Sequence, residues 1–210
     1  MTMVLAMDTT GSAPAMAVLH DDEVLASWQG DTARTPLISG LRAMQAGQNL
    51  PLRELRGRLS TVAAAMGPGR YARLRAGVAF AKGLATGLGV PFVGVRSAAA
   101  VARAAGGHVG PIVIPAGRGR VYFWTCGRSA PLGPAIGPPE LAAQLGAGVT
   151  VAGDVDDDTA EGIRAAGMRL RPIQPVEVAQ ALGRLAGERD PSIVGVGVAR
   201  PIYAPAAGHG

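Results

Sequence analysis

The sequence predicts an α/β fold of two lobes, and three observations lead to this prediction. Short apolar runs separated by polar turns open the chain and are typical of a three-stranded meander. Helical and strand patterns then alternate up to about residue 104. From Gly106 and Gly107 onward, the sequence changes to glycine, proline and short apolar runs. We therefore expect a first lobe over residues 1–104 and a second lobe over residues 105–210.

The first lobe is expected to have the element order βββαβαβα. Strands are predicted at residues 3–7, 14–20, 24–28, 59–66 and 91–95. Helices are predicted between residues 35 and 49, over residues 71–88, and after Ser97, whose residue type favours a helix N-cap. Gly77, Gly83 and Gly87 lie inside the second helix, where each costs about 1 kcal/mol relative to alanine. We therefore expect another backbone to approach these glycines closely.

The second lobe is expected to consist mainly of strands and loops. Strands are predicted at residues 112–114, 121–125 and 149–152, and residues 129–139 are predicted to form a loop. The acidic run from Asp156 to Asp158 is interpreted as a solvated loop. A helix is predicted over about residues 176–186, and packing back onto the first lobe is one option for it.

The composition excludes several classes of protein. Hydrophobic residues make up 48% of the chain and charged residues 17%, which is typical of a globular protein. The single cysteine, Cys126, cannot form an internal disulfide or a thiolate cluster, and the three histidines are far apart in the sequence. No apolar run is long enough to span a membrane, and the first eight residues lack the pattern of a signal peptide. We therefore expect a cytoplasmic protein with no membrane segment and no metal site of its own.

The net charge of +5 comes almost entirely from arginine, since only one of the 20 basic residues is a lysine. Arginine suits contacts with phosphate or with acidic partners. However, aromatic residues are only 4% of the chain and are not interleaved with the arginines, which argues against stand-alone nucleic-acid binding by base stacking.

Three glycine-containing turns are candidates for phosphate binding. Asp8-Thr9-Thr10-Gly11 joins two predicted strands, Gly67-Pro68-Gly69 precedes a predicted helix, and Gly153-Asp154 follows a predicted strand. Free amides in such turns and at helix N-termini can hold an anion. Each turn also has a purely structural interpretation as a tight connection, and none of them matches a Walker A loop.

Several of these segments together resemble a known family. Met3-Val4-Leu5-Ala6-Met7-Asp8-Thr9-Thr10, the segment from Gly67 to Ala85, and Pro201-Ile202-Tyr203 are similar, in this order, to the TsaB family, also called YeaZ. The central segment matches the family pattern GPGSFTGLRxGxxxAKGLA most specifically. The resemblance spans nearly the whole chain.

The resemblance implies an actin-like, Hsp70-like ATPase fold of two related α/β lobes, with the second lobe reduced. It also implies a non-catalytic scaffold subunit that supports a TsaD-type catalytic subunit in threonylcarbamoylation of the adenosine next to the anticodon of tRNA. A TsaE-type ATPase joins the complex in this family, and tRNA contacts are expected only within it. No cofactor is then required by this chain, ATP and metal belong to the partner subunits, and Asp8, Thr9, Thr10 and Gly11 form a vestigial phosphate loop.

The family pairs with its partner through helices of the first lobe. The corresponding residues here are Leu37, Leu41, Met44, Leu74, Arg75, Gly77, Val78, Ala81 and Ala85. They could form half of a four-helix bundle, either with TsaD in a heterodimer or with a second copy in a homodimer when the chain is alone. The alternative is that this apolar stripe belongs to the core of the lobe.

One departure from the family pattern further favours a structural role, while a second function stays open as an alternative. Arg70-Tyr71-Ala72-Arg73 stands where the family has Ser-Phe-Thr-Gly, which puts helix capping and any anion contact there in doubt. An ATPase or kinase-like enzyme of the same fold would instead need Asp8 and Asp154 to face each other across a nucleotide.

Overall fold

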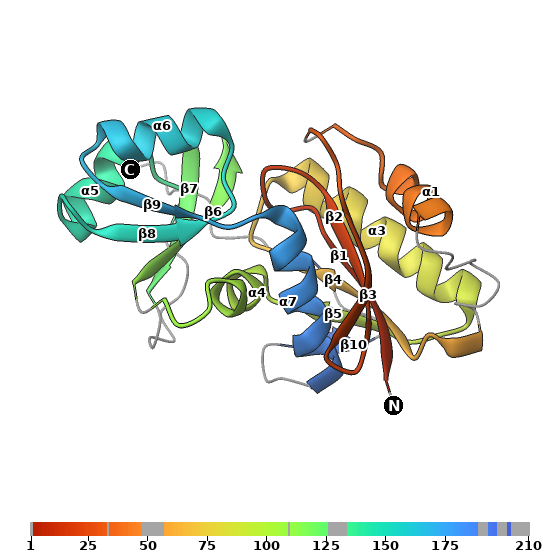
Figure 1. Cartoon of the computed structure of the whole chain (residues 1–210). Coiled ribbons are helices and arrows are strands. Elements are labelled where there is room, and N and C mark those ends of the chain that lie inside the picture. Colours follow the sequence, from red (N-terminus) through yellow and green to blue (C-terminus); the bar gives the residue numbers. More distant parts are fainter. Residues whose placement is uncertain are drawn as a thin grey trace.

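Two β-sheets, each with its own helices, form the two lobes of the molecule (Figure 1). The computed structural model describes residues 2–32, 34–47, 57–108, 110–125, 134–188, 193–196 and 201–202. Cys126 and Tyr203 lie outside the described residues.

The larger sheet contains six strands in the order β10-β5-β4-β1-β2-β3. These strands are β1 (Met3–Asp8), β2 (Ala15–His20), β3 (Glu23–Gln29), β4 (Thr61–Ala65), β5 (Phe92–Val95) and β10 (Ile193–Val196). The central strands β1, β4 and β5 are parallel, while β2, β3 and β10 run antiparallel to their neighbours. The register places Leu5 opposite Val18 of β2 and Val62 of β4. The order therefore joins the predicted meander to a parallel centre.

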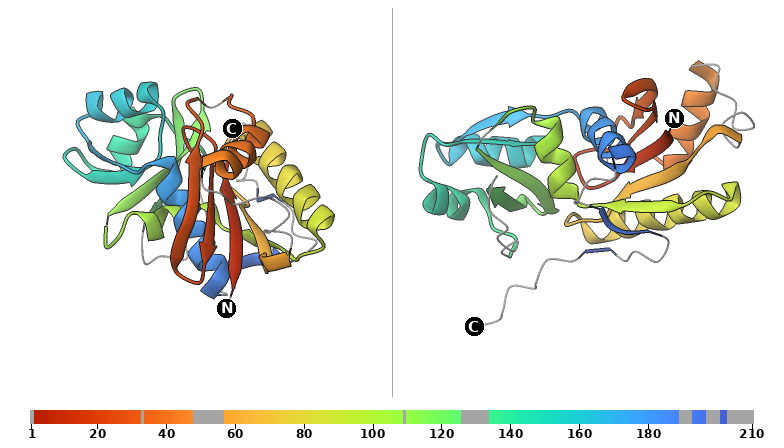
Figure 2. Two further views of the ribbon diagram at one scale, coloured as in Figure 1. Left: turned by 45° about the vertical axis from the view of Figure 1, so that its right-hand side comes forward. Right: turned by 90° about the horizontal axis from the view of Figure 1, so that it is seen from below.

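Alternation along the buried strands divides this lobe into two apolar layers. Met3, Leu5 and Met7 pack on the side of α1 (Leu37–Gly47) and α3 (Tyr71–Leu88). Val4 and Ala6 face the opposite side, which is covered by α4 (Ser97–Ala104) and α7 (Pro175–Glu188). Figure 2 shows α1 and α3 on one side of the first strands and α7 on the other. A strand buried on both faces explains why β1 is an uninterrupted apolar run.

The smaller sheet has the order β7-β6-β8-β9. Its elements are β6 (Pro111–Gly117), β7 (Arg120–Thr125), α5 (Pro138–Leu145), β8 (Thr150–Gly153), α6 (Asp157–Ala165) and β9 (Arg169–Pro172). Val113, Val121 and Val151 pack with Leu141 of α5 and Ile163 of α6. The other face of this sheet, with Ile112 and Ile114, shares an apolar cluster with α4 and α7.

The chain returns to the first lobe after β9. Helix α7 packs on β1 and β2, where a Cβ added at Gly183 would lie 2.3 Å from Leu19 Cδ1. Strand β10 then pairs with β5 at the edge of the larger sheet. The second lobe is thus an insertion that follows α4 in the chain, and α4 and α7 lie between the two sheets (Figure 1).

Most predicted elements are confirmed, and most of the exceptions lie in the second half. Helix α5 begins at Pro138, inside the segment predicted as a loop. The acidic run is the start of α6 rather than a loop, because the side chain of Asp156 caps that helix. Strands β9 and β10 were not predicted. Ser97 is the first residue of α4 and not its N-cap, which is Arg96, and its hydroxyl accepts a hydrogen bond from the Gly67 amide instead (3.0 Å).

Within the described part of the chain, no helix is long and apolar enough to cross a membrane.

Candidate functional site

The site lies where the carboxyl end of a strand from each lobe meets the other lobe. Strand β1 ends at Asp8, and strand β8 ends at Gly153, just before Asp154. The carboxyl ends of parallel strands are where α/β folds position ligands. The Ser12 amide, in the loop after β1, donates a hydrogen bond to Asp154 Oδ1 over 2.9 Å. The structure therefore brings together two of the turns that the sequence singled out.

Asp8 is almost completely buried, with 1% of its surface exposed. Its Oδ1 accepts hydrogen bonds from the amide of Thr10 (3.0 Å) and from the Thr10 hydroxyl (2.7 Å). Its Oδ2 has no partner among the described residues. Burial raises the pKa of Asp8, and the bonds from Thr10 and the positive charge of Arg73 act against this rise. The interpretation that Asp8 only stabilises its own turn therefore explains the bonds of Oδ1 but not the burial of Oδ2.

Asp154 has a similar environment on the other side of the junction. It is 3% exposed, its Oδ1 accepts from Ser12, and its Oδ2 has no partner in the described residues. Burial raises the pKa of Asp154 to about 6; hydrogen bonds from Ser12 and the charge of Arg73 lower it, whereas the charge of Asp8 raises it further. Two buried carboxyls from different lobes therefore interact electrostatically.

Arg73, in the first turn of α3, reaches into this junction. Its Nη1 donates to the carbonyl oxygens of Gly11 (2.8 Å) and Ser12 (3.4 Å). Burial lowers the pKa of Arg73, as does the nearby charge of Arg70, while the charges of Asp8 and Asp154 raise it. A guanidinium nevertheless stays protonated in proteins, so Arg73 is the cation of the site. The backbone carbonyl of the same residue accepts a hydrogen bond from the Thr9 hydroxyl (3.0 Å), which ties the loop to α3.

A second arginine crosses between the lobes next to the first. The Nη2 of Arg70 forms an ion pair with Asp156 Oδ2, and both side chains are partly exposed. The other oxygen of Asp156 accepts from the amide (2.9 Å) and hydroxyl (2.6 Å) of Thr159, as an N-cap does. The ion pair therefore ties the residue before α3 to the start of α6.

Glycine residues, which have no side chain, allow the segments of this junction to approach one another closely. A Cβ added at Gly11 would lie 1.7 Å from Asp154 Oδ2, and one added at Gly77 would lie 2.3 Å from Thr9 Oγ1. One added at Gly69 would lie 2.8 Å from Thr10 Cγ2. Gly77 thus has a close neighbour, but it is the side chain of Thr9 and not the backbone that was predicted. Gly83 and Gly87 have none, because an added Cβ would meet nothing within 4 Å in the described chain.

The Gly67-Pro68-Gly69 turn uses its polar groups within the protein. The Gly67 amide donates to Ser97, and the Gly67 carbonyl accepts from the Ser97 amide (3.0 Å). The amide of Ile202 donates to Met66 (2.6 Å), which places the segment at residues 201–202 beside the turn. These bonds fix the start of α3 against α4, and support the structural interpretation of this turn.

The predicted partner-binding residues are mostly in the core, which corrects that prediction. Buried between the helices and the larger sheet are Leu41, Met44, Leu74, Gly77, Val78, Ala81 and Ala85. Leu37 is half-buried and Arg75 is exposed. Helical spacing identifies an apolar stripe but not whether the stripe faces a sheet or a partner, and here it faces the sheet.

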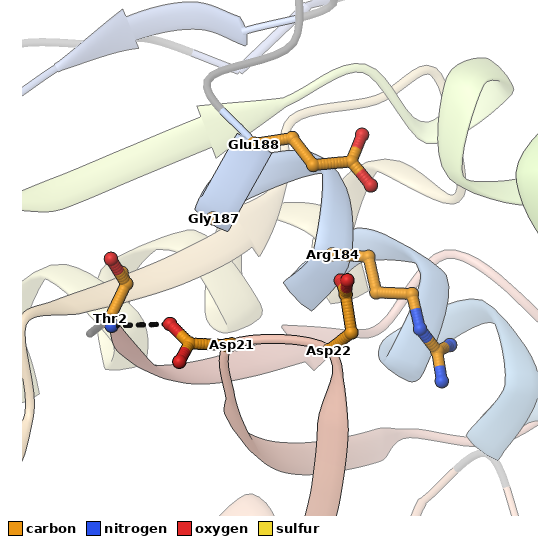
Figure 3. A pocket seen from close by; sticks show the side chains of 6 residues that line it. All are labelled: Thr2, Asp21, Asp22, Arg184, Gly187 and Glu188. Atoms are coloured by element: carbon orange, nitrogen blue, oxygen red, sulfur yellow. Dashed lines mark hydrogen bonds between the residues drawn. The ribbon is translucent and has the colours of Figure 1, made fainter.

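Two hollows lie away from the junction. A hollow of about 190 Å³ at the amino end of β1 is lined by Thr2, Asp21, Asp22, Arg184, Gly187 and Glu188 (Figure 3). The Asp21 carboxylate points toward the amide of Thr2, which donates to it over 2.8 Å, and this bond lowers the pKa of Asp21. The other hollow lies between α5 and α6. Neither contains a residue that the sequence predicted to be functional, and no three metal-ligating side chains cluster in the described ranges.

Solved structures of other proteins share the fold of this chain. The chain is similar over its whole length to YeaZ from Pseudomonas aeruginosa, with 20% sequence identity, a TM-score of 0.66 and coverage of 97% of this chain and 100% of that one. It is equally similar to an uncharacterized protein described as resembling peptidase YeaZ from the same organism, with 17% identity, a TM-score of 0.64, and coverage of 98% and 100%.

The chain has the YeaZ fold. This confirms the fold class that the sequence resemblance implied, and the wider set of neighbours belongs to the actin-like ATPase fold. One of them, the activator of 2-hydroxyisocaproyl-CoA dehydratase from Clostridium difficile, was solved with bound ADPNP; it has 9% identity, a TM-score of 0.51, and coverage of 90% of this chain and 95% of that one.

Sequence comparison gives a partial match. Residues 54–135 match the family model of TsaD, tRNA N6-adenosine threonylcarbamoyltransferase. No curated protein matches this sequence. The YeaZ fold therefore rests on the structure, and the matched segment covers β4, α3 and the elements that follow up to β7.

Sequence reasoning found some members of the site and missed others. It named Asp8, Thr9, Thr10 and Gly11 as a loop and weighed Asp154 opposite them. It noted Arg70 and Arg73 as part of an arginine cluster and as departures from a family pattern, without a role in this site. Two arginines in place of small polar residues at the start of a helix were the signal that charges gather there. Their partners could not be identified, because Asp154 and Asp156 belong to a different lobe.

Proposed function

We propose that this chain is a non-catalytic scaffold subunit that supports a TsaD-type catalytic subunit in threonylcarbamoylation of the adenosine next to the anticodon of tRNA. The observation that carries the proposal is the YeaZ fold along nearly the whole chain. The match of residues 54–135 to the TsaD family model supports a place in the same tRNA modification. A cytoplasmic location goes with this role.

The exposed side of α3 is the surface that we assign to the partner. Ala72, Ala76, Ala79 and Gly83 are exposed and lie four, three and four residues apart, so they form one stripe along the helix. Glycine inside a helix costs about 1 kcal/mol relative to alanine, and nothing in the described chain requires Gly83. A stripe of small residues allows a second helix to approach closely.

Two large apolar side chains of α3 and α1 are exposed. Tyr71, at the start of α3, is 57% exposed, and Ile38 on α1 is 45% exposed. The Arg75 guanidinium lies 5.2 Å from the centre of the Tyr71 ring and donates to its hydroxyl over 2.9 Å. Aromatic and arginine side chains of this kind are enriched where protein partners bind. This surface, Ile38, Tyr71, Ala72, Arg75, Ala76, Ala79 and Gly83, is called the α3 face below.

The remaining partners follow from the same proposal. A second copy and a TsaD-type subunit would use the same α3 face, so the homodimer formed by the chain alone and the heterodimer exclude each other. A TsaE-type ATPase would join the complex, and tRNA would contact this chain only within it. ATP and metal would be held by the partner subunits.

The test is complex formation with the TsaD-type protein of the same organism, followed by size-exclusion chromatography with light scattering. Ala76→Arg places a long charged side chain in the middle of the α3 face while leaving the core untouched, since Ala76 is exposed. Burying an unpaired charge in an interface costs several kcal/mol, so we expect affinity to fall by at least about 100-fold. Val78 is unsuitable for this purpose because it is 4% exposed and packs in the core.

Ala143→Arg is the matched control, because Ala143 is an exposed alanine on α5 in the other lobe. It should bind the partner as tightly as the wild type does. Absence of any wild-type complex, or an equal loss in both arginine variants, would contradict the proposal.

A nucleotide-binding ATPase or kinase-like enzyme is the second candidate. One observation favours it: Asp8 and Asp154 come from different lobes and each has an oxygen without a partner in the described chain.

A further inference from the structure

Two backbone amides of the loop after β1 that could hold a phosphate are already used by the chain. The Ser12 amide donates to Asp154, and the Thr10 amide donates to Asp8. A phosphate bound by the loop after β1 would need such amides to be free. Here a carboxylate from the other lobe accepts the hydrogen bond that an anion would accept.

The space between the loops is also too small for a phosphate. A Cβ placed on Gly11 would lie 1.7 Å from Asp154 Oδ2 and 2.5 Å from Asp154 Cγ, distances at which two atoms overlap. A bridging phosphate is far larger than one methyl group. The side chain of Asp154 therefore rests directly on the backbone of the loop.

An arginine supplies positive charge near the two buried carboxyls. A magnesium ion that accompanies a nucleotide would be attracted by Asp8 and Asp154, which are both buried. The guanidinium of Arg73 already interacts with both charges and is held in place by the carbonyls of Gly11 and Ser12. The residues present do not fit a magnesium nucleotide, in contrast to the fold neighbour solved with ADPNP.

We propose that Asp154 and Arg73 form an internal plug, which replaces the anion and the cation of a bound nucleotide and, with the Arg70–Asp156 ion pair, holds the two lobes in one orientation without a ligand. Each contact joins different parts of the chain. Asp154 joins the second lobe to the loop after β1, Arg73 joins α3 to the same loop, and Arg70 joins α3 to the cap of α6. This inference concerns the chain alone and does not depend on the α3 face.

The charges explain why the plug needs both arginines. Asp8, Asp154 and Asp156 bring three negative charges to the junction, and Arg70 and Arg73 bring two positive ones. Without Arg73, two buried carboxylates would face each other with no cation, and they would repel. An open arrangement of the lobes would then let water solvate both.

The test measures the distance between the lobes by electron paramagnetic resonance. Spin labels are attached at Glu23→Cys on β3 and Glu161→Cys on α6, both exposed, after the single native cysteine has been replaced by serine. We expect one narrow distance distribution for the otherwise unaltered protein, and addition of magnesium ATP should leave it unchanged. A magnesium-ATP-dependent shift would overturn the proposal, since a plugged junction has no place for the nucleotide.

The variant Arg73→Met removes the cation and keeps the length of the side chain. We expect a second, longer distance between the labels. Arg171→Met is the control: Arg171 is an exposed arginine on β9, so the variant loses the same charge outside the junction and should keep the narrow distribution. Equal distributions in Arg73→Met and the control would show that Arg73 does not hold the lobes.

Two milder variants keep the proposal testable if Arg73→Met does not fold. Asp154→Asn keeps an acceptor for the Ser12 amide, whereas Asp154→Ala removes it. Hydrogen exchange at Ser12 should therefore stay slow in the first and become about tenfold or more faster in the second. Fast exchange of this amide in the unaltered protein would mean that the bond is not kept in solution and would reject the plug.

Discussion

At the scale of single residues, the most informative group is the carboxyl of Asp154. Burial raises its pKa to about 6, from the usual 3.8 of an aspartate. A raised pKa in the folded state means that folding favours the protonated form, so stability falls as the pH rises from about 3.8 to about 6 and this loss is complete above that range. Near neutral pH, the plug therefore reduces the stability of the protein, which is common at functional sites.

This cost predicts a pH-dependent effect of Asp154→Asn. The asparagine keeps an acceptor for Ser12 but has no charge to bury, so we expect it to raise the free energy of unfolding at about pH 8 by up to about 3 kcal/mol, from the shift to about 6. Near pH 4 the wild-type carboxyl is protonated in the folded state, and the gain in stability from Asp154→Asn should largely disappear. Urea unfolding of both proteins at pH 8 and pH 4 measures the difference in their free energies of unfolding.

The charged neighbours that face Asp154 are Asp8 and Arg73, and they act in opposite directions on its pKa. Asp8→Asn serves as the comparison, because its carboxyl is also buried with a raised pKa. A gain from Asp154→Asn that is the same at both pH values would show that the effect does not come from ionisation.

At the scale of elements, two glycines of α3 have opposite environments although they lie less than two turns apart. An added Cβ would meet open space at Gly83 and would lie 2.3 Å from Thr9 Oγ1 at Gly77. Alanine is favoured over glycine in a helix by about 1 kcal/mol. We therefore expect Gly83→Ala to stabilise the free chain by about 0.5–1 kcal/mol and Gly77→Ala to destabilise it, because Thr9 must move.

Chemical unfolding of each alanine variant and of the wild type measures whether the free energy of unfolding rises, as expected for Gly83→Ala, or falls, as expected for Gly77→Ala. The same two variants also separate the roles of the two sides of α3. If Gly83→Ala destabilised the free chain, some contact at Gly83 would exist that the described residues do not contain. A stabilised Gly83→Ala variant that binds the partner less tightly would place a close helix contact at this position.

Elements with a strong hydrophobic pattern were predictable from the sequence. The elements that were missed show what such a pattern cannot predict. Alternation and helical spacing identified β1 to β5, α1 and α3, since their apolar faces are buried. Helix α6 was hidden by three consecutive aspartates, of which Asp156 is the cap. The sequence of β9, Arg169–Pro172, has two exposed arginines and lacks a strand signal, and β10 is defined by its pairing with the distant β5. Local pattern contains no information about such pairings.

At the scale of the whole molecule, the site depends on how the lobes meet. Asp8 and Gly11 were identifiable from the sequence because they end a strand and form a turn. The contacts that complete the site join residues 142 apart, Ser12 and Asp154, and 86 apart, Arg70 and Asp156. Burial of the predicted interface residues is also a consequence of assembly, because the larger sheet covers their side of α1 and α3. The orientation of the two lobes therefore had to be known before the site, and the packing of the helices on the larger sheet before the free surface.

Gly11 gives the strictest test of that orientation. Its φ is not positive, so alanine fits the local backbone, and the obstacle to Gly11→Ala is Asp154 in the other lobe, 1.7 Å from the added Cβ. We expect Gly11→Ala to destabilise the protein by about 1–3 kcal/mol, the usual cost of overpacking. In Asp154→Ala the carboxyl is gone and the nearest remaining atom, Cβ, lies 3.2 Å from the added methyl, so Gly11→Ala should cost much less there.

A double-mutant cycle in urea should therefore give a coupling energy of about 1 kcal/mol or more. Additive effects would mean that the loop after β1 and Asp154 do not touch in solution, and the lobes would then be oriented differently from the arrangement described here.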